Sequence, residues 1–210
     1  MSSESPKVLL LFSGGLDSTA LAIMLRPTLL FVDYGQRARL AEKSAAIQIA
    51  YELRLPLRTV SLGIREFGSG LLHGGLSTRD APSPEWWPYR NQFLATAGAA
   101  VALEEGCGTI ALGSVGPDGE RHRDGTKDFY ELLDALIAYQ EGGVHVTAPG
   151  IEHTTEELVR RSDASPAIIA WTYSCHRADR PCGECPGCWK RQQVLASVGV
   201  PGYTWGPLED

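Results

Sequence analysis

The sequence predicts an α/β fold with a mostly parallel sheet and helices on both faces. Short apolar runs alternate with longer segments of helical spacing along most of the 210 residues, the order that a parallel sheet with crossover helices requires. The first apolar run ends in Ser13-Gly14-Gly15 and passes at once into a helix. Four of the five cysteines lie within residues 175–188, which adds a small C-terminal segment that is typical of metal binding.

The predicted elements follow in order. The expected strands are residues 7–13, 28–34, 58–62, 109–114 and 144–148, and the expected helices are residues 17–25, 37–53, 91–105, 127–139, 154–161 and 189–198. Residues 154–157 (TTEE) have the form of a capping box and begin the fifth of these helices. Residues 63–89 are rich in Gly, Pro and Ser and form a long loop, which in a compact domain is more often functional than idle.

Composition sets the broad class. Hydrophobic residues make up 43% of the chain and charged residues 21%, and the net charge is −6, so nucleic acid is not an expected partner. No apolar stretch approaches the ~20 residues of a membrane span, and residues 1–6 lack the apolar core of a secretory leader. We expect a cytoplasmic protein with a main α/β part over residues 1–165 and a C-terminal segment over 166–210. A homodimer is one option for its assembly.

The loop at residues 13–18 (SGGLDS) is built to receive phosphate. Glycines let the backbone approach a ligand, and the helix that follows offers unpaired N–H groups. The loop lacks the lysine of a Walker A motif and the G-x-G-x-x-G of a dinucleotide fold. It resembles the PP-loop of the ATP pyrophosphatases, while a plain strand-to-helix turn with Asp17 as the cap is the alternative. The resemblance implies that ATP binds at Phe12, Ser13, Gly14, Gly15, Leu16, Asp17, Ser18 and Thr19, with Ser13, Asp17 and Ser18 acting in catalysis.

The cysteine cluster indicates a structural metal. Its spacing is Cys175-x6-Cys182-x2-Cys185-x2-Cys188, and four thiolates match the tetrahedral preference of Zn²⁺ while leaving no position for a substrate. An iron–sulfur cluster is the alternative. Cys107 stands apart and is expected to be a small buried apolar residue.

Three polar stretches are candidates for the wall of a substrate site. Asp33-Tyr34-Gly35-Gln36-Arg37 follows the second strand, where a plain glycine turn is the alternative. Residues 83–93 (SPEWWPYRNQF) hold two tryptophans, which can equally be packing residues, and Asn91, which can equally cap a helix. Residues 113–129 are dense in hydrogen-bonding groups, although solvated loops share that composition, and His122 there can be only a neighbour. The substrate-binding candidates are Tyr34, Gln36, Arg37, Trp86, Arg90, Asn91, Asp124 and Lys127.

The order of these motifs resembles the 7-cyano-7-deazaguanine synthases over almost the whole chain, from Val8 to about Leu195. The resemblance implies a PP-loop, HUP-like fold of the adenine nucleotide alpha hydrolase type, with ATP, Mg²⁺ and Zn²⁺ as cofactors. It also implies a ligase that activates 7-carboxy-7-deazaguanine with ATP, forms an amide with ammonia and dehydrates it to a nitrile. Asp124 suits the base, because one carboxylate can accept both the N1–H and the exocyclic amine.

The chain also departs from that family. The usual Pro-Gly-Arg-Asn is Pro88-Tyr89-Arg90-Asn91 here, and HRDGTKDF (residues 122–129) replaces the family's Ser-Gly-Tyr-Pro-Asp-Cys-Arg segment. These departures resemble the divergent synthase-like proteins found among bacterial defence genes, in which a protein amine is an alternative acceptor to ammonia. A non-catalytic zinc-stabilised binding module and a tRNA-thiolating PP-loop enzyme are further alternatives, the last disfavoured by the acidic charge.

Overall fold

The structure, a computed structural model, describes residues 7–201, so the outer ends of the two expected parts, residues 1–6 and 202–210, lie outside it. The strands are β1 (Val8–Leu11), β2 (Thr28–Asp33), β3 (Leu57–Ser61), β4 (Thr109–Ala111) and β5 (His145–Thr147). The longer helices are α1 (Leu16–Leu25), α2 (Arg39–Leu53), α4 (Arg90–Glu104), α6 (Lys127–Ala138), α7 (Thr155–Ser162) and α9 (Pro186–Ser197). The short ones are η1 (Arg65–Phe67), α3 (Gly70–His73), α5 (Gly116–Arg121), η2 (Arg123–Gly125) and α8 (Pro166–Trp171).

The five strands form one sheet in the order β3-β2-β1-β4-β5, and every pairing is parallel. The chain therefore moves outward from β1 to β3, then crosses to β4 and β5 on the other side. This reversal of order lies between β1 and β4, where the carboxyl ends of the strands leave a crevice for a ligand. The predicted mostly parallel sheet is confirmed.

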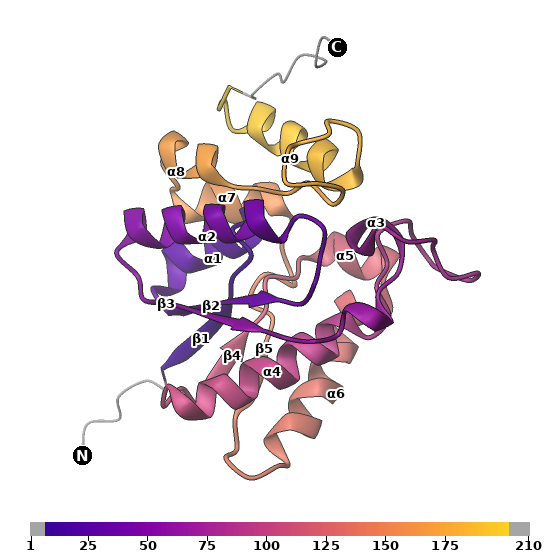
Figure 1. Cartoon of the computed structure of the whole chain (residues 1–210). Helices are drawn as coiled ribbons and strands as arrows, with labels where there is room; N and C mark the ends of the chain where they lie inside the picture. Colours follow the sequence, from indigo (N-terminus) through magenta and orange to yellow (C-terminus); the bar gives the residue numbers. More distant parts are fainter. Residues whose placement is uncertain (1–6, 202–210) are drawn as a thin grey trace.

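Helices cover both faces of the sheet, as expected. Figure 1 shows α1 and α2 on one side and α4 and α6 on the other. The buried apolar residues form two large clusters, one on each face of the sheet. One contains Leu10, Phe31 and Ile49, and the other contains Leu9, Leu30 and Ile110. Alternate residues of each strand enter opposite clusters, because successive side chains point to opposite faces.

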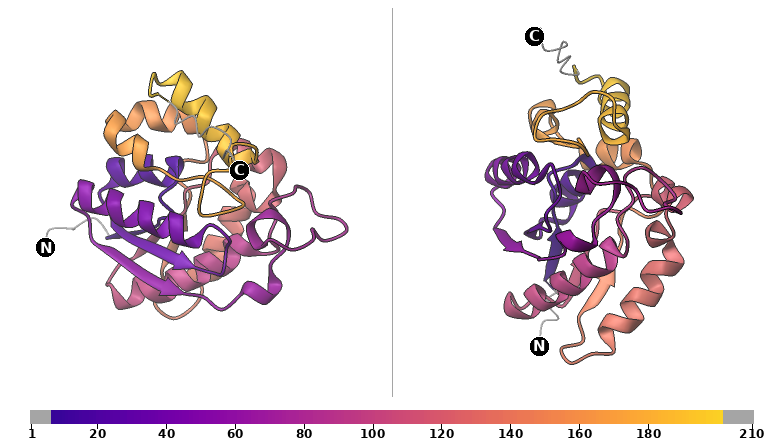
Figure 2. Two further views of the ribbon diagram at one scale, coloured as in Figure 1. Left: turned by 45° about the horizontal axis from the view of Figure 1, so that its top comes forward. Right: turned by 45° about the vertical axis from the view of Figure 1, so that its right-hand side comes forward.

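The C-terminal helices belong to the first of these two layers. Figure 2 shows the orange and yellow segments beyond α1 and α2 in both views. Leu195 of α9 and Ile169 of α8 are almost fully buried in the same apolar cluster as Leu10. The C-terminal segment thus shares its core with the sheet and closes over the carboxyl ends of the strands.

The boundaries differ from the sequence prediction where proline and glycine occur. Helix α9 begins at Pro186, three residues before the predicted start, because proline is accommodated in the first turn of a helix and Cys185 caps it. Pro166 likewise begins α8, after the cap Ser165. The predicted helices include neither α8 nor the first turn of α9. The predicted capping box of α7 is confirmed, since Thr154 Oγ1 accepts from Glu157 N at 3.2 Å.

Between residues 7 and 201, no helix has both the length and the apolar character needed to cross a membrane.

Candidate active site

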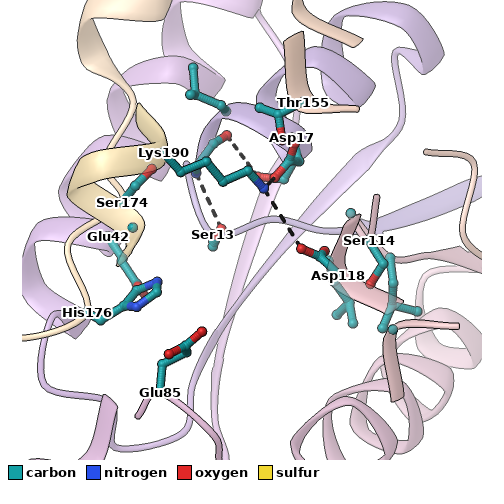
Figure 3. Close-up of a pocket in the computed structure, with 18 of the residues that line it drawn as sticks. Ser13, Asp17, Glu42, Glu85, Ser114, Asp118, Thr155, Ser174, His176 and Lys190 are labelled. Atoms are coloured by element: carbon teal, nitrogen blue, oxygen red, sulfur yellow. Dashed lines mark hydrogen bonds and ion pairs between the residues drawn. The ribbon is translucent and has the colours of Figure 1, made fainter. Parts of the chain in front are cut away.

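A cavity of about 890 Å³ opens at the carboxyl ends of the central strands. Ser13 lines it after β1, Tyr34 after β2, and Ser114 after β4. These three side chains, each beyond the carboxyl end of a parallel strand, therefore face one space. Residues from α7 and α9 complete the wall, including Thr155 and Lys190 (Figure 3).

The SGGLDS loop connects β1 to α1 at the floor of this cavity. Gly14 has a φ of +76°, and a Cβ there would lie 2.8 Å from Ala46 N of α2, so glycine is required at this position. Ser13 Oγ accepts from Gly15 N at 3.3 Å, and Ser18 Oγ donates to Gly15 O at 3.2 Å. No side chain caps α1, and its first N–H groups have no partner within the helix. The loop can therefore present amide and hydroxyl donors to an anion.

Asp17 brings a carboxylate to the same place. Burial raises the pKa of the Asp17 carboxyl, and the positive charge of Lys190 opposes that rise. Lys190 Nζ lies 3.2 Å from Asp17 Oδ2 and 3.9 Å from Asp118 Oδ1. Asp17 Oδ1 is buried and has no hydrogen-bond partner among residues 7–201, so it can accept from a ligand or contact a cation.

A second carboxyl group, Glu42 of α2, is held at the cavity by Gln36. Gln36 Nε2 donates to Glu42 Oε2 at 2.8 Å and to Val32 O at 3.4 Å, while its Oε1 accepts from Tyr34 N at 3.0 Å. Burial raises the pKa of Glu42 to about 7, although the hydrogen bond from Gln36 acts in the opposite direction. Gln36 thus orients a carboxyl group rather than presenting free amide groups of its own.

Glu85 lies on the wall formed by residues 83–91, and its surroundings favour the ionised carboxylate. Burial disfavours the charged form of Glu85, but His122 and Arg121 outweigh it and hold the pKa of Glu85 at about 2. Arg121 Nη2 lies 2.6 Å from Glu85 Oε1, and His122 Nε2 lies 3.7 Å from the same oxygen. Asn91 Nδ2 donates to Asp124 O at 2.9 Å, which ties this wall to the loop that holds Asp124.

The four cysteines converge at one end of α9. Their sulfurs all lie within 4.8 Å of one another, with 4.0 Å between the sulfurs of Cys182 and Cys188 and between those of Cys175 and Cys185. A tetrahedral shell with Zn–S bonds of about 2.3 Å separates its sulfurs by about 3.8 Å. Backbone N–H groups donate to the sulfurs of Cys175, Cys182 and Cys185 at 3.3–3.4 Å. The cluster therefore fits a tetrahedral metal such as zinc, and these N–H donors favour thiolate ligands.

The sequence model described as "Queuosine biosynthesis protein QueC" matches residues 7–199. The chain belongs to the QueC family.

Curated relatives are similar to this chain over most of the length of both proteins. The 7-cyano-7-deazaguanine synthase of Methanosarcina mazei is 25% identical over 223 residues, covering 92% of this chain and 95% of the relative. The 7-cyano-7-deazaguanine synthase 1 of Desulfitobacterium hafniense is 28% identical, covering 90% and 91%. The 7-cyano-7-deazaguanine synthase of Methanothermobacter thermautotrophicus is 29% identical, covering 90% and 94%. The resemblance expected from the motifs is confirmed.

In this QueC family member most of the expected site residues share the cavity. Those lining it are Phe12, Ser13, Gly15, Leu16, Asp17, Ser18, Tyr34, Gln36, Arg90, Asn91 and Asp124. Five expected residues are not part of its lining: Gly14, Thr19, Arg37, Trp86 and Lys127. Trp87 is 1% exposed and packs against Tyr34 with ring centroids 5.1 Å apart, which agrees with the packing alternative for that residue. Asn91 is not the cap of α4, because Tyr89 occupies that position.

Other lining residues were not among the predicted site residues. Glu42, Glu85, Asp118, His176 and Lys190 all line the cavity, and Glu85 and Asp118 lie within two of the polar stretches that the sequence indicated. Lys190 lies two residues beyond the last cysteine of the predicted metal-binding cluster. Glu42 lies six residues beyond Gln36, and this spacing becomes informative only once Gln36 is known to point inward.

Proposed function

We propose that this QueC family protein activates the carboxylate of 7-carboxy-7-deazaguanine with ATP and converts it to an amide and then to a nitrile. The observation that carries the proposal is that the SGGLDS loop and the side chains of Arg90, Asn91 and Asp124 open into one cavity of about 890 Å³. A cavity of that volume has room for a nucleotide beside a flat base. The names of the curated relatives support the same reaction.

The chemistry begins at the loop. A carboxylate oxygen of the substrate attacks the α-phosphorus of ATP, and the bond to the β-phosphate bridging oxygen breaks, releasing pyrophosphate. The pyrophosphate gains negative charge on leaving, and the positive end of α1, the hydroxyls of Ser13 and Ser18 and the loop amides, which line the cavity, would stabilise it. Mg²⁺ would supply further charge neutralisation when bound with ATP. Asp17 would help to hold it, which is supported by the buried Oδ1 that lacks a hydrogen-bond partner in the described part of the chain.

Ammonia then displaces AMP from the acyl carbon and loses a proton, giving the amide. The amide oxygen attacks the α-phosphorus of a second ATP, releasing pyrophosphate, and the nitrogen loses its two protons as the oxygen leaves with AMP, which gives the nitrile. Asp124 would hold the base, since its carboxylate can accept from both N1–H and the exocyclic amine. Asn91 positions this segment through its hydrogen bond to the Asp124 carbonyl.

The C-terminal segment over residues 166–210 would be stabilised by zinc held by Cys175, Cys182, Cys185 and Cys188. A closed shell of four thiolates supplies no open coordination position, so its role would be structural. The same segment contributes Lys190 and His176 to the cavity wall, which joins the metal site to the place of reaction.

The test is mass spectrometry of the products after incubation with ATP, Mg²⁺ and the deazaguanine acid, with and without ammonia. We expect AMP, pyrophosphate and a deazaguanine amide or nitrile that depends on ammonia. ADP and phosphate would contradict adenylation. A deazaguanine adduct on protein would favour the protein-amine ligase of a defence system, and no consumption of ATP would favour a non-catalytic module. Neither alternative has specific support from the relatives.

A further inference from the structure

Lys190 joins the C-terminal segment to the phosphate loop. It lies on α9, two residues after Cys188, and its Nζ is 3.2 Å from Asp17 Oδ2, across 173 positions of the sequence. The same nitrogen is 3.9 Å from Asp118 Oδ1 of α5. Figure 3 shows the side chain reaching from α9 toward the loop, with its nitrogen beside Asp17 and a dashed line to Asp118.

This arrangement differs from a buried structural ion pair. The Lys190 side chain is 39% exposed and lines the cavity. An ammonium group has three N–H donors, and only one of them is used in a hydrogen bond, to Asp17 Oδ2. The carboxylates of Asp17 and Asp118, on separate elements, attract the ammonium group from two sides, and it still lines the cavity at the start of α1.

The phosphate loop has no cation of its own, because SGGLDS contains neither lysine nor arginine. Two other cations at the cavity have partners elsewhere: Arg121 pairs with Glu85 at 2.6 Å, and Arg191 donates to Thr172 Oγ1 and Ala170 O. Arg90 also lines the cavity, on the wall that carries Asn91. Lys190, in contrast, forms its ion pair with the loop itself. Released pyrophosphate is strongly anionic, and a lysine is a suitable point charge for it.

We propose that Lys190 binds the phosphate oxygens of ATP that become pyrophosphate, so that the four-cysteine segment supplies the cation the loop lacks. The inference rests on the proposed function, since it assumes that ATP binds at this loop. Asp17 and Asp118 act as positioning residues for the ammonium group in this arrangement.

The start of α9 is fixed well enough to hold Lys190. Cys185 is the helix cap, its sulfur accepting from Cys188 N at 3.4 Å. Gly187 packs so closely that a Cβ there would lie 1.9 Å from Ser174 O. The backbone at Gly187 and Cys188 is therefore set by this contact and by the cysteine cluster, which fixes the place from which the Lys190 side chain leaves α9.

The test measures binding of inorganic pyrophosphate and of ATP, each with Mg²⁺, by isothermal titration calorimetry. We expect Lys190→Ala to weaken pyrophosphate binding by about 10- to 100-fold, the range typical for a hydrogen bond to a charged group, and Lys190→Arg to retain most of the affinity. Lys43→Ala, which removes an exposed lysine of α2, is the matched control and is expected to bind as the wild type does.

A double-mutant comparison separates direct contact from simple neutralisation of Asp17. If Lys190 contacts phosphate, Lys190→Ala also weakens binding in an Asp17→Asn background. If the loss disappears in that background, or if Lys190→Ala binds pyrophosphate normally and only lowers the melting temperature, the inference is wrong while the proposed function stands. Conversely, lysine-dependent pyrophosphate binding without AMP formation from the deazaguanine acid supports the inference and contradicts the proposed function.

Discussion

Replacing Cys185 with Ala is expected to destabilise the protein rather than only to reduce its activity. The side chain is fully buried, and its sulfur accepts from His176 N at 3.3 Å and Cys188 N at 3.4 Å. Each buried donor left unpaired costs about 1–3 kcal/mol, so two cost about 2–6 kcal/mol before any metal is counted. Structural zinc contributes ~10–16 kcal/mol of apparent binding energy, comparable to a domain's whole margin of ~5–15 kcal/mol.

The expected loss is therefore at least about 3 kcal/mol, or roughly 6–12 °C in melting temperature for a chain of this size. Thermal unfolding followed by circular dichroism measures this shift, and elemental analysis of the purified protein measures zinc per chain. The wild type is expected to carry one zinc, and Cys185→Ala to carry none.

Two further variants show where the stability comes from. Cys185→Ser keeps an oxygen that can cap α9 but removes the thiolate, so it should lose zinc and melt close to Cys185→Ala. Cys107→Ala removes another buried cysteine, which lies outside the cluster, and should keep its zinc and lose much less stability. Wild-type protein of normal stability without zinc, or a Cys185→Ala variant that melts with the wild type, would refute the reasoning.

Three other predictions concern the cavity. Ser18→Ala should lower turnover by ~10²–10³ because it removes a donor to pyrophosphate, with zinc content unchanged; normal turnover in a product assay would contradict this. Asp124→Asn should weaken binding of the deazaguanine acid by about 1–3 kcal/mol in calorimetry, because an acceptor becomes a donor facing a donor, while equal loss of ATP binding would count against the assignment. Burial raises the pKa of Glu42 from 4.5 to about 7, so folding favours its protonated form, and the contribution of Glu42 to stability should fall by up to about 3 kcal/mol as pH rises between these values. Glu42→Gln should accordingly be more stable than the wild type at pH 8 but not at pH 4.5, as urea unfolding at the two pH values would show.

Much of the fold and the main motifs were predictable because they depend on residues that are close in sequence. The alternation of apolar runs with helical segments predicts a parallel sheet, and the position of SGGLDS after the first run predicts a loop at its carboxyl end. The cysteine spacing is similarly local, since two tight Cys-x2-Cys turns bring three sulfurs together before any long-range packing occurs.

Side-chain direction could not be predicted in the same way. Gln36 follows β2 as expected, but whether its amide faces a ligand or Glu42 depends on how α2 packs against the sheet. Trp86 and Trp87 are neighbours with the same chemistry, yet Trp87 is buried against Tyr34 while Trp86 lies outside the cavity lining.

The sequence by itself determined the sheet, the SGGLDS loop after its first strand and the four-sulfur cluster, because local hydrogen bonding and hydrophobic periodicity act over a few residues. Tertiary structure alone decided that Lys190 meets Asp17 and Asp118, and that Glu42 and Glu85 face the same cavity. These side-chain contacts depend on the position of α9 over the sheet and on the packing of α2 and α5. Such positions are set by burial of apolar surface, which is non-directional and leaves no signature at the polar residues that it brings together.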